Sequence, residues 1–192
     1  MTNEIAKAVE VFNQGGIVIF PTDTAFGIGC RMDNESVVKR LFTLRKRPVS
    51  QAVSVLVSSI SMAQKYLMPL TSEVMEIMQK HWPGGLTIVY PCRKELVLPL
   101  IRAKGETLGV RMPDHYELLQ VIETVGMPVL GPSANFHGLP TPFMIENLNP
   151  ELVEQVDYVL EGFCSGDQAS TVLDCSVKPW KIIRQGAVAL QL

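Results

Sequence analysis

The first apolar pattern along the chain has helical spacing. Its members share one side of a helix: Ile5, Ala8, Val9 and Phe12. Thr2 or Asn3 can cap the start and Gly15 follows the end, so the pattern predicts a helix over residues 3–14. A compact β-branched run at residues 17–20 comes directly afterwards and ends at a proline, which predicts a buried strand.

Helical and strand patterns alternate along the rest of the chain. A second helix is predicted to begin near Asn34 and to end at Pro48. Further helices are predicted at residues 71–82 and 116–125, and further strands at residues 53–57, 86–90, 129–130, 158–160, 171–173 and 181–183. Interleaved strands and helices of this length predict an α/β fold, a twisted sheet with helices packed against it. We expect one domain over residues 1–192, with residues 132–142 as an ordered loop.

Composition narrows the possible function classes. The chain has 192 residues, 47% of them hydrophobic, which is enough for one large core, and its formal net charge is -2. A near-neutral chain is a poor candidate for coating nucleic acid, although a local basic patch can still bind an anion. We therefore expect a small partner rather than a polymeric one.

The cysteines and the apolar runs indicate the cellular environment. No cysteine has a CxxC partner or a histidine at metal-ligand spacing, so we expect no metal site and four free thiols: Cys30, Cys92, Cys164 and Cys175. The polar start of the chain resembles no signal region, so we expect a reducing, cytoplasmic location. The apolar runs are too short to cross a bilayer, so we expect no membrane association.

Polar side chains follow several predicted strands. Residues 22–24 are Thr-Asp-Thr after the first strand, where open α/β sheets bind ligands, and a turn that satisfies its own backbone is the alternative. Residues 45–47 are Arg-Lys-Arg at a helix end, where cations also occur because of the helix dipole alone. Ser133 and Asn135 supply a hydroxyl and an amide suited to phosphate or ribose.

Common nucleotide and hydrolase signatures are absent from the sequence. It contains no GxxxxGK[ST] loop and no GxGxxG fingerprint, so a nucleotide site would be of another kind. No GxSxG elbow or HExxH helix supplies a partner for His81, His115 or His137. We expect these histidines to serve packing or to lie at the surface.

Seven short motifs occur in a fixed order over nearly the whole chain. They are GG-x4-PTDT-x-x-G at residues 15–27, the basic turn before Pro48, WPGGLT at 82–87, TLGVRMP at 107–113, SAN at 133–135, STVLD at 170–174 and IRQG at 183–186. In this order they resemble the YrdC-like family of threonylcarbamoyl-adenylate synthases. The resemblance implies a twisted mixed sheet with flanking helices around a concave basic groove. The end of the chain soon after Arg184 implies the short, single-domain form.

The resemblance implies a nucleotidyltransferase that joins ATP, bicarbonate and L-threonine. N-carboxy-threonine forms, its carboxylate attacks the α-phosphate of ATP, and pyrophosphate leaves. The product, threonylcarbamoyl-AMP, passes to a separate tRNA threonylcarbamoyl transferase complex that modifies adenosine 37 of tRNAs reading ANN codons. This reaction needs positioning and charge neutralisation rather than a protein nucleophile. Mg²⁺ bound mainly by phosphates and water would need no carboxylate cage.

The resemblance also assigns site residues by matched position. The threonine contacts would be Thr24, Arg111 and Gly131, with the arginine suited to a bidentate grip on a carboxylate. The catalytic pair would be Arg45 and Arg47. The implied ATP contacts are Arg45, Arg47, Thr107, Ser133, Asn135, Thr141, Ser170 and Arg184.

Three positions depart from the family pattern. The lysine of the usual Lys-x-Arg turn is Arg45 here, with Lys46 displaced by one residue. Gln51 stands where lysine or asparagine is common, and His137 where serine is common. If Arg45 takes over the lysine's task, Lys46 points to solvent, because adjacent side chains diverge. The competing register brings Lys46 inward.

Two other functions stay open. One is a tRNA- or double-stranded-RNA-binding module of the same fold without synthase activity, although the acidity of the chain argues against it. The other is an enzyme that activates a different small amine or acts in carbamoyl-phosphate chemistry. Direct weak tRNA binding is also compatible with a synthase. Pyrophosphate release with threonine, compared with serine and without RNA, separates these functions.

Overall fold

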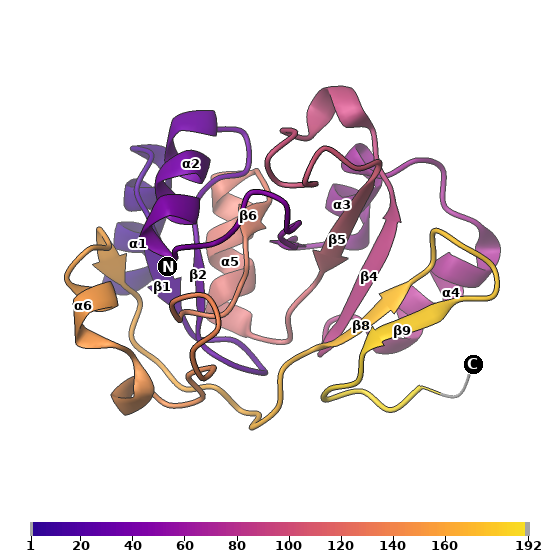
Figure 1. The fold of residues 1–192 in the computed structure, drawn as a ribbon. Coiled ribbons are helices and arrows are strands. Elements are labelled where there is room, and N and C mark those ends of the chain that lie inside the picture. The colour runs from indigo at the N-terminus through magenta and orange to yellow at the C-terminus, as the bar shows by residue number, and fades with distance from the viewer. Residues whose placement is uncertain (1, 191–192) are drawn as a thin grey trace.

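Two sheets carry the fold of the computed structural model (Figure 1). The model describes residues 2–190, so Met1, Gln191 and Leu192 of the expected domain lie outside the described residues. The three-stranded sheet has the order β2-β1-β7: β1 Val18–Phe20, β2 Gly27–Gly29 and β7 Tyr158–Val159. The six-stranded sheet has the order β6-β3-β5-β4-β8-β9: β3 Val55–Leu56, β4 Leu86–Pro91, β5 Thr107–Arg111, β6 Val129–Leu130, β8 Thr171–Asp174 and β9 Lys181–Arg184.

Helices flank both sheets. They are α1 Asn3–Asn13, α2 Glu35–Leu44, α3 Ile60–Tyr66, α4 Ser72–His81, α5 Tyr116–Val125 and α6 Pro150–Val153, with the 3₁₀ turns η1 Lys94–Leu96 and η2 Ile145–Asn147. Thr2 caps α1, since its Oγ1 accepts the Ile5 N–H at 3.3 Å, and the predicted apolar face of this helix is buried. Helices α1 and α5 pack against each other.

The predicted fold class is confirmed, and most predicted elements are present. The helix predicted to end at Pro48 ends earlier, at Leu44. Lys46 adopts a left-handed φ of 54°, which turns the chain out of the helix before the proline is reached. The sequence did not predict β2, a Gly-Ile-Gly strand, or the short helix α3, whose cap is Ser59.

The strands form two sheets where the sequence predicts one, but backbone hydrogen bonds tie the two sheets together. The Leu130 N–H donates to the Cys30 carbonyl at 2.9 Å, and the Met32 N–H donates to the Pro128 carbonyl at 3.1 Å. Gly29 permits this approach, because a Cβ there would lie 1.9 Å from the Leu130 carbonyl oxygen. The two sheets therefore hold a fixed relative position.

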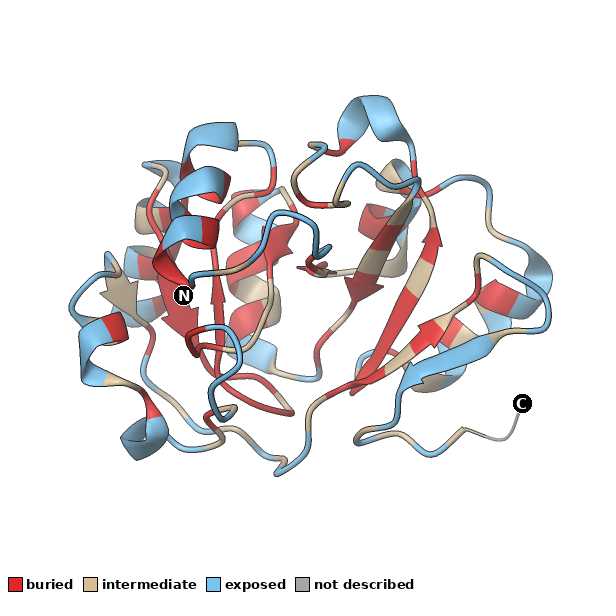
Figure 2. Cartoon of the chain, viewed as in Figure 1, coloured by how far each residue is buried: buried red, intermediate tan, exposed pale blue. Residues whose placement is uncertain are grey.

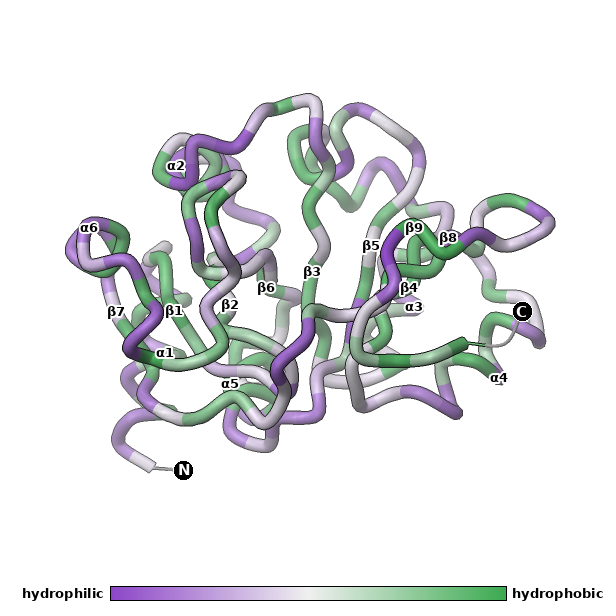
Figure 3. Tube along the Cα trace, turned by 60° about the horizontal axis from the view of Figure 1, so that its bottom comes forward, coloured by the Kyte–Doolittle hydropathy of each residue, from purple (hydrophilic) through white to green (hydrophobic). Residues whose placement is uncertain are grey.

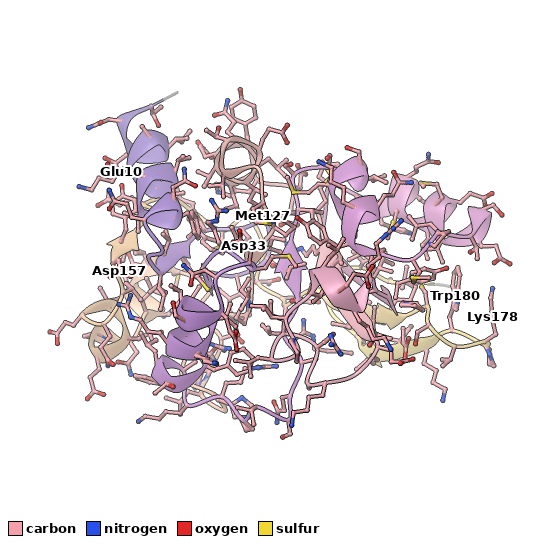
Figure 4. The ribbon with its side chains drawn as sticks, turned by 90° about the horizontal axis from the view of Figure 1, so that it is seen from above. Glu10, Asp33, Met127, Asp157, Lys178 and Trp180 are labelled. Carbon is pink, nitrogen blue, oxygen red and sulfur yellow. The ribbon has the colours of Figure 1, made fainter. Side chains whose placement is uncertain are left out.

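Burial differs strongly between strands. Strands β1 and β2 are buried at every residue, whereas β9 is exposed at every residue (Figure 2). In Figure 3 the chain is coloured as hydrophobic along β1, whereas hydrophilic and hydrophobic residues alternate in the β8–β9 hairpin. Asp157, just before β7, accepts the Ile17 N–H at 2.7 Å and Arg40 Nη1 at 2.6 Å (Figure 4).

The cysteine side chains and the lengths of the helices are visible within residues 2–190. All four cysteines are free; Cys164 is half-buried and the other three are buried. Among the described helices none has the length and apolar character needed to span a bilayer.

Candidate functional site

A pocket of about 500 Å³ opens on one face of the six-stranded sheet, where the sheet meets the loops that follow β1, α2 and β6. Strand alternation supplies its floor: Thr107, Gly109 and Arg111 of β5 face the pocket while Leu108 and Val110 are buried behind them. Ten of the eleven predicted site residues line this pocket, and the exception is Asn135. The structure thus brings together residues that lie far apart in sequence.

Arg45 is a buried cation without a charged partner. It is 3% exposed; its Nε donates to the Asn135 carbonyl at 3.0 Å and its Nη2 to Asn135 Oδ1 at 3.2 Å. Nη1 is buried and has no hydrogen-bond partner within residues 2–190. Burial, and secondly the charge of Arg47, lowers the pKa of Arg45 to about 10, so it remains charged at neutral pH. Arg45 lines the pocket and therefore brings to it a charge that no carboxylate within residues 2–190 neutralises.

Arg47 lines the pocket and Lys46 does not. Arg47 donates to two backbone carbonyls, those of Gln51 and Ala52, and burial lowers its pKa. Lys46 is exposed, and its Nζ lies 4.8 Å from the centroid of the Phe136 ring. Of the two registers considered for the basic turn, the structure has the one with Arg45 inward. A contact of either arginine with ATP stays a prediction.

Arg111 ends β5 and is held from three sides. Its Nε donates to the Gly84 carbonyl at 3.0 Å, its Nη1 to Thr24 Oγ1 at 2.7 Å, and its Nη2 forms an ion pair with Asp23 Oδ1. Burial lowers the pKa of Arg111, although Asp23 acts in the opposite direction. These contacts fix the plane of the guanidinium at the pocket wall, and the predicted position of Arg111 at a strand end is confirmed.

The hydroxyl groups of Thr22 and Thr24 have different roles. Thr22 Oγ1 donates to the Ala25 carbonyl at 2.7 Å and accepts the N–H groups of Thr24 and Ala25 at 3.0 and 3.1 Å. The proton and both lone pairs of Thr22 are therefore used within the turn. Thr24 Oγ1 accepts from Arg111 Nη1 and lies 3.0 Å from Thr22 Oγ1, to which it can donate its proton. The segment is a self-satisfied turn and a pocket wall at once.

A second cluster connects β9, β8 and β4. Arg184 donates Nε and Nη2 to the Ser170 carbonyl at 3.0 and 2.8 Å, and Nη2 also donates to Ser170 Oγ at 3.0 Å. Ser170 Oγ lies 2.9 Å from Thr87 Oγ1, and both hydroxyls are buried. Partial burial lowers the pKa of Arg184. Thr87 was not predicted as a site residue. It ends the WPGGLT motif and lines the pocket from β4, between Leu86 and Ile88.

Asn135 lies behind the pocket wall. Its Oδ1 accepts from Ser133 Oγ at 2.6 Å as well as from Arg45, and its Nδ2 donates to the Leu139 carbonyl. The residue is 9% exposed and does not line the pocket. Since both ends of its amide are used inside the protein, Asn135 positions Arg45 and Ser133. The predicted ATP contact of Asn135 itself has no support in this geometry.

The charge of the pocket is opposite to that of the chain. Its walls hold four arginines, Arg45, Arg47, Arg111 and Arg184, and one carboxylate, Asp174, for a formal charge of +3 (4 − 1), whereas the chain carries -2. Asp23 behind the wall neutralises Arg111, which leaves a formal charge of +2 (3 − 1). Burial lowers the pKa of all four arginines, so a bound anion would relieve a real electrostatic cost. Residues 2–190 contain no group of three or more acidic, histidine or cysteine side chains that could hold a metal ion.

The fold and the pocket define an α/β protein with an arginine-lined pocket suited to an anion. The arginines and the converging hydroxyls suit a phosphate-bearing ligand, and the Arg111–Thr24 pair suits a carboxylate beside it. The Sua5/YciO/YrdC family model, described as "Telomere recombination", matches residues 10–186, and the chain belongs to this family. The family resemblance of the sequence is therefore confirmed.

Individual relatives extend this comparison. A threonylcarbamoyl-AMP synthase of Bacillus subtilis is 31% identical over 186 residues, which cover 96% of this chain and 54% of the relative. The crystal structure of Pyrococcus abyssi Sua5 complexed with L-threonine has a TM-score of 0.89 at 28% identity, over 97% of this chain and 55% of that one. Escherichia coli YciO has a TM-score of 0.85 at 26% identity, over 95% and 88%. The chain spans about half the length of the first two proteins.

Proposed function

We propose that this chain is a threonylcarbamoyl-AMP synthase that uses ATP, bicarbonate and L-threonine. The observation that carries the proposal is Arg45, a buried charge whose Nη1 has no partner within residues 2–190, in a pocket with a formal charge of +3. An unpaired buried charge is costly, and the negative charge of a triphosphate in the pocket would offset that cost. The B. subtilis synthase and the P. abyssi complex with L-threonine support the choice of substrates.

The proposed reaction divides the pocket into two ends. Thr24 and Arg111 would hold the threonine carboxylate, with Gly131 leaving room for the amino acid. Bicarbonate and the threonine amine form a C–N bond and release water to give N-carboxy-threonine, whose carboxylate oxygen attacks the α-phosphorus. The bond from that phosphorus to pyrophosphate breaks. Arg45 and Arg47 would neutralise the charge that builds on the phosphates, so no protein nucleophile is needed.

The remaining polar residues of the wall would hold ATP. Ser133, Thr107, Thr141 and the Ser170–Arg184 pair line the pocket, and their donors suit phosphate and ribose oxygens. Mg²⁺ would enter with ATP and neutralise phosphate charge. The donor set fits an ion held by phosphates and water, because one carboxylate lines the pocket and residues 2–190 hold no acidic cluster. The product would pass to a separate tRNA threonylcarbamoyl transferase complex.

Pyrophosphate release by the full chain tests the proposal. We expect release to require ATP, Mg²⁺, bicarbonate and L-threonine together, to proceed without tRNA, and to yield threonylcarbamoyl-AMP by mass spectrometry. Serine in place of threonine is the matched control. Equal release without threonine would contradict the proposal. Tight binding of double-stranded RNA with no release would favour the RNA-binding module instead.

A further inference from the structure

Thr171 is a buried hydroxyl residue that lies outside the pocket. It begins β8 and is 0% exposed, and it does not line the pocket although its neighbours Ser170 and Val172 do. Its Oγ1 donates to the Val188 carbonyl at 2.7 Å and accepts the N–H groups of Gly186 and Val188 at 3.0 and 3.1 Å. The proton and both lone pairs of this hydroxyl are therefore used by the chain that follows β9.

After β9 the chain turns back alongside the β8–β9 hairpin (Figure 1). We call Gly186, Ala187 and Val188 the tail segment. The Ala187 N–H donates to the Ala169 carbonyl at 2.9 Å, and a Cβ on Gly186 would collide with the same carbonyl oxygen. The tail segment therefore lies directly against the start of β8, and most of its polar anchoring runs through the single hydroxyl of Thr171.

The turn Gly84–Gly85 connects Thr171 with Arg111. The Thr171 N–H donates to the Gly85 carbonyl at 2.9 Å, and the Gly84 carbonyl accepts Arg111 Nε at 3.0 Å. The Gly84 N–H donates to the Met112 carbonyl at 2.8 Å. A shift of this turn would therefore move one of the three groups that fix the guanidinium plane of Arg111.

The tail segment and Thr24 meet over one face of Gly85. A Cβ built on Gly85 would lie 3.1 Å from Ala187 Cβ, 3.4 Å from Thr24 Cγ2 and 3.6 Å from Val188 Cγ2. Thr24 in turn lines the pocket and accepts from Arg111 Nη1. The tail segment thus packs behind the threonine end of the pocket without lining the pocket itself.

We propose that Thr171 and the tail segment are positioning elements that hold Arg111 and Thr24 in place for the carboxylate of L-threonine. They act through the Gly84–Gly85 turn, and neither lines the pocket. The inference rests on the proposed function and deepens it, because it assigns residues outside the pocket to the use of one of the substrates.

The proposed ATP contacts at this end of the sheet are held independently of the tail segment. Arg184 precedes the tail segment and pairs with Val172 of β8. Its Nε and Nη2 donate to the Ser170 carbonyl, and Nη2 also donates to Ser170 Oγ. Release of the tail segment should therefore weaken the use of threonine and leave the binding of ATP nearly unchanged.

Kinetics of threonine-dependent pyrophosphate release test the proposal. Thr171→Val keeps the branched shape but removes the hydroxyl, which leaves the N–H groups of Gly186 and Val188 without their acceptor. We expect KM for threonine to rise about tenfold, because small displacements of a substrate-positioning group are costly. At saturating threonine kcat should recover to within about threefold, and the Kd of ATP measured without threonine should stay within about twofold.

Three further variants separate positioning from a loss of stability. Val188→Pro removes the N–H that donates to Thr171 and should raise KM for threonine in the same selective way. Thr171→Ser keeps the hydroxyl and should remain close to wild type. Asp157→Asn, which removes an ion pair far from the pocket, is the matched control for stability and should leave both substrates unaffected.

The double variant Thr171→Val/Val188→Pro tests whether the two residues act through one contact. If they do, the double variant should be no weaker in its use of threonine than the weaker single variant. Full additivity of the two effects would contradict this part of the proposal.

Hydrogen exchange of the wild type tests the proposal without any substitution. A segment that favours threonine binding must itself be stabilised by bound threonine, because coupling between sites is reciprocal. We expect L-threonine to slow exchange of the Gly186 and Val188 amides several-fold. The Leu160 amide, which donates to the Ile19 carbonyl in the other sheet, is the control and should change less.

Three outcomes would overturn the proposal. The first is an unchanged KM for threonine in Val188→Pro together with unchanged exchange of the tail amides, a result that decides the matter even if Thr171→Val does not fold. The second is an equal loss of ATP and threonine in Thr171→Val, which would show a general defect of β8. The third is a wild type without threonine-dependent release, which overturns the proposed function as well, whereas the first two leave that function intact.

Discussion

The head of Arg45 does two tasks that a lysine could not combine. Two of its nitrogen atoms donate to the carbonyl and the side-chain amide of Asn135, while the guanidinium still brings its positive charge to the pocket wall. A lysine has one compact ammonium group and cannot present three nitrogens in a fixed plane. The departure from the Lys-x-Arg pattern is thus accommodated by Asn135, which the arginine fork contacts twice.

Single substitutions in the basic turn should separate sharply. We expect Arg45→Met and Arg47→Met each to reduce threonine-dependent pyrophosphate release at least about a hundredfold, because a preorganised charge at the phosphates is lost. Lys46→Met, the matched control, should stay within about threefold of wild type, since Lys46 is exposed and does not line the pocket. A damaged Lys46→Met beside an active Arg45→Met would contradict this assignment.

For individual residues, the sequence predicted most of those that line the pocket but did not predict the positions of a few. The family resemblance assigned eleven residues, and ten of them line one pocket, because most of the motifs contain or follow a strand that borders it. Thr87 and Asp174 were missed, since a residue's face on a strand depends on a register that the sequence does not show. An ATP contact of Asn135 stays a prediction; that the residue lies behind the pocket wall depends on the fold of its loop, which the sequence does not show.

Among the elements, those with a strong periodic pattern were predicted and the weakly patterned ones were not. Helix α1 agrees with its prediction to within one residue because its cap and apolar face lie in one short segment. Strand β2 is Gly-Ile-Gly, whose low strand propensity is overridden by pairing with β1 and by the close approach of Leu130 at Gly29. The division into two sheets depends on long-range pairing, which local patterns do not contain.

The carboxylate of Asp157 should make the stability of β7 depend on pH. Burial raises the pKa of Asp157, but the hydrogen bonds from Arg40 and from the Ile17 N–H lower it more, so the net shift is downward. A group with a depressed folded pKa stabilises the fold above its unfolded value and loses this contribution as the pH falls. We expect Asp157→Asn to lose about 1 kcal/mol at pH 7 in urea unfolding, a value reduced for solvent exposure.

The pH dependence distinguishes this role from a simple packing defect. The difference in unfolding free energy between wild type and Asp157→Asn should shrink as the pH falls below about 4, the ordinary pKa of an unfolded aspartate, and through the lower folded pKa of Asp157. Glu154→Gln, an exposed change on the same connection, is the control and should show no such trend. A difference that stays constant from pH 7 to pH 3 would show that the charge of Asp157 is unimportant.

The whole molecule separates its charge, with an acidic total and a cationic pocket. Such a pocket attracts anions strongly at low salt, because the surrounding protein screens it less than water does. Ligand binding should therefore increase the free energy of unfolding of the entire chain. ATP with Mg²⁺ at about 100 times its Kd should add about 2.7 kcal/mol to the free energy of unfolding, or raise Tm by roughly 5–10 °C.

Thermal unfolding with matched ligands checks this expectation. Adenosine should stabilise much less than ATP because it lacks the phosphates, and added salt should reduce the effect of ATP. Lys178→Gln should keep the full effect, because this lysine does not line the pocket and lies 4.4 Å from the centroid of the Trp180 ring at the β9 end (Figure 4). Equal stabilisation by adenosine and ATP would place the binding energy outside the arginine-lined walls.

The parallel pairing of β1 with β7 has a consequence for synthesis on the ribosome. Ile17 and its hydrogen-bond partner Asp157 are 140 residues apart in the sequence. A ribosome needs roughly 7–28 s to synthesise that length of chain. Throughout that interval the apolar strand Val18–Phe20 has an unpaired edge of the kind that recruits other strands. The β7 edge of β1 therefore stays open until residue 159 has emerged. Since Ser170 and Arg184 follow later still, ligand cannot rescue the unfinished chain.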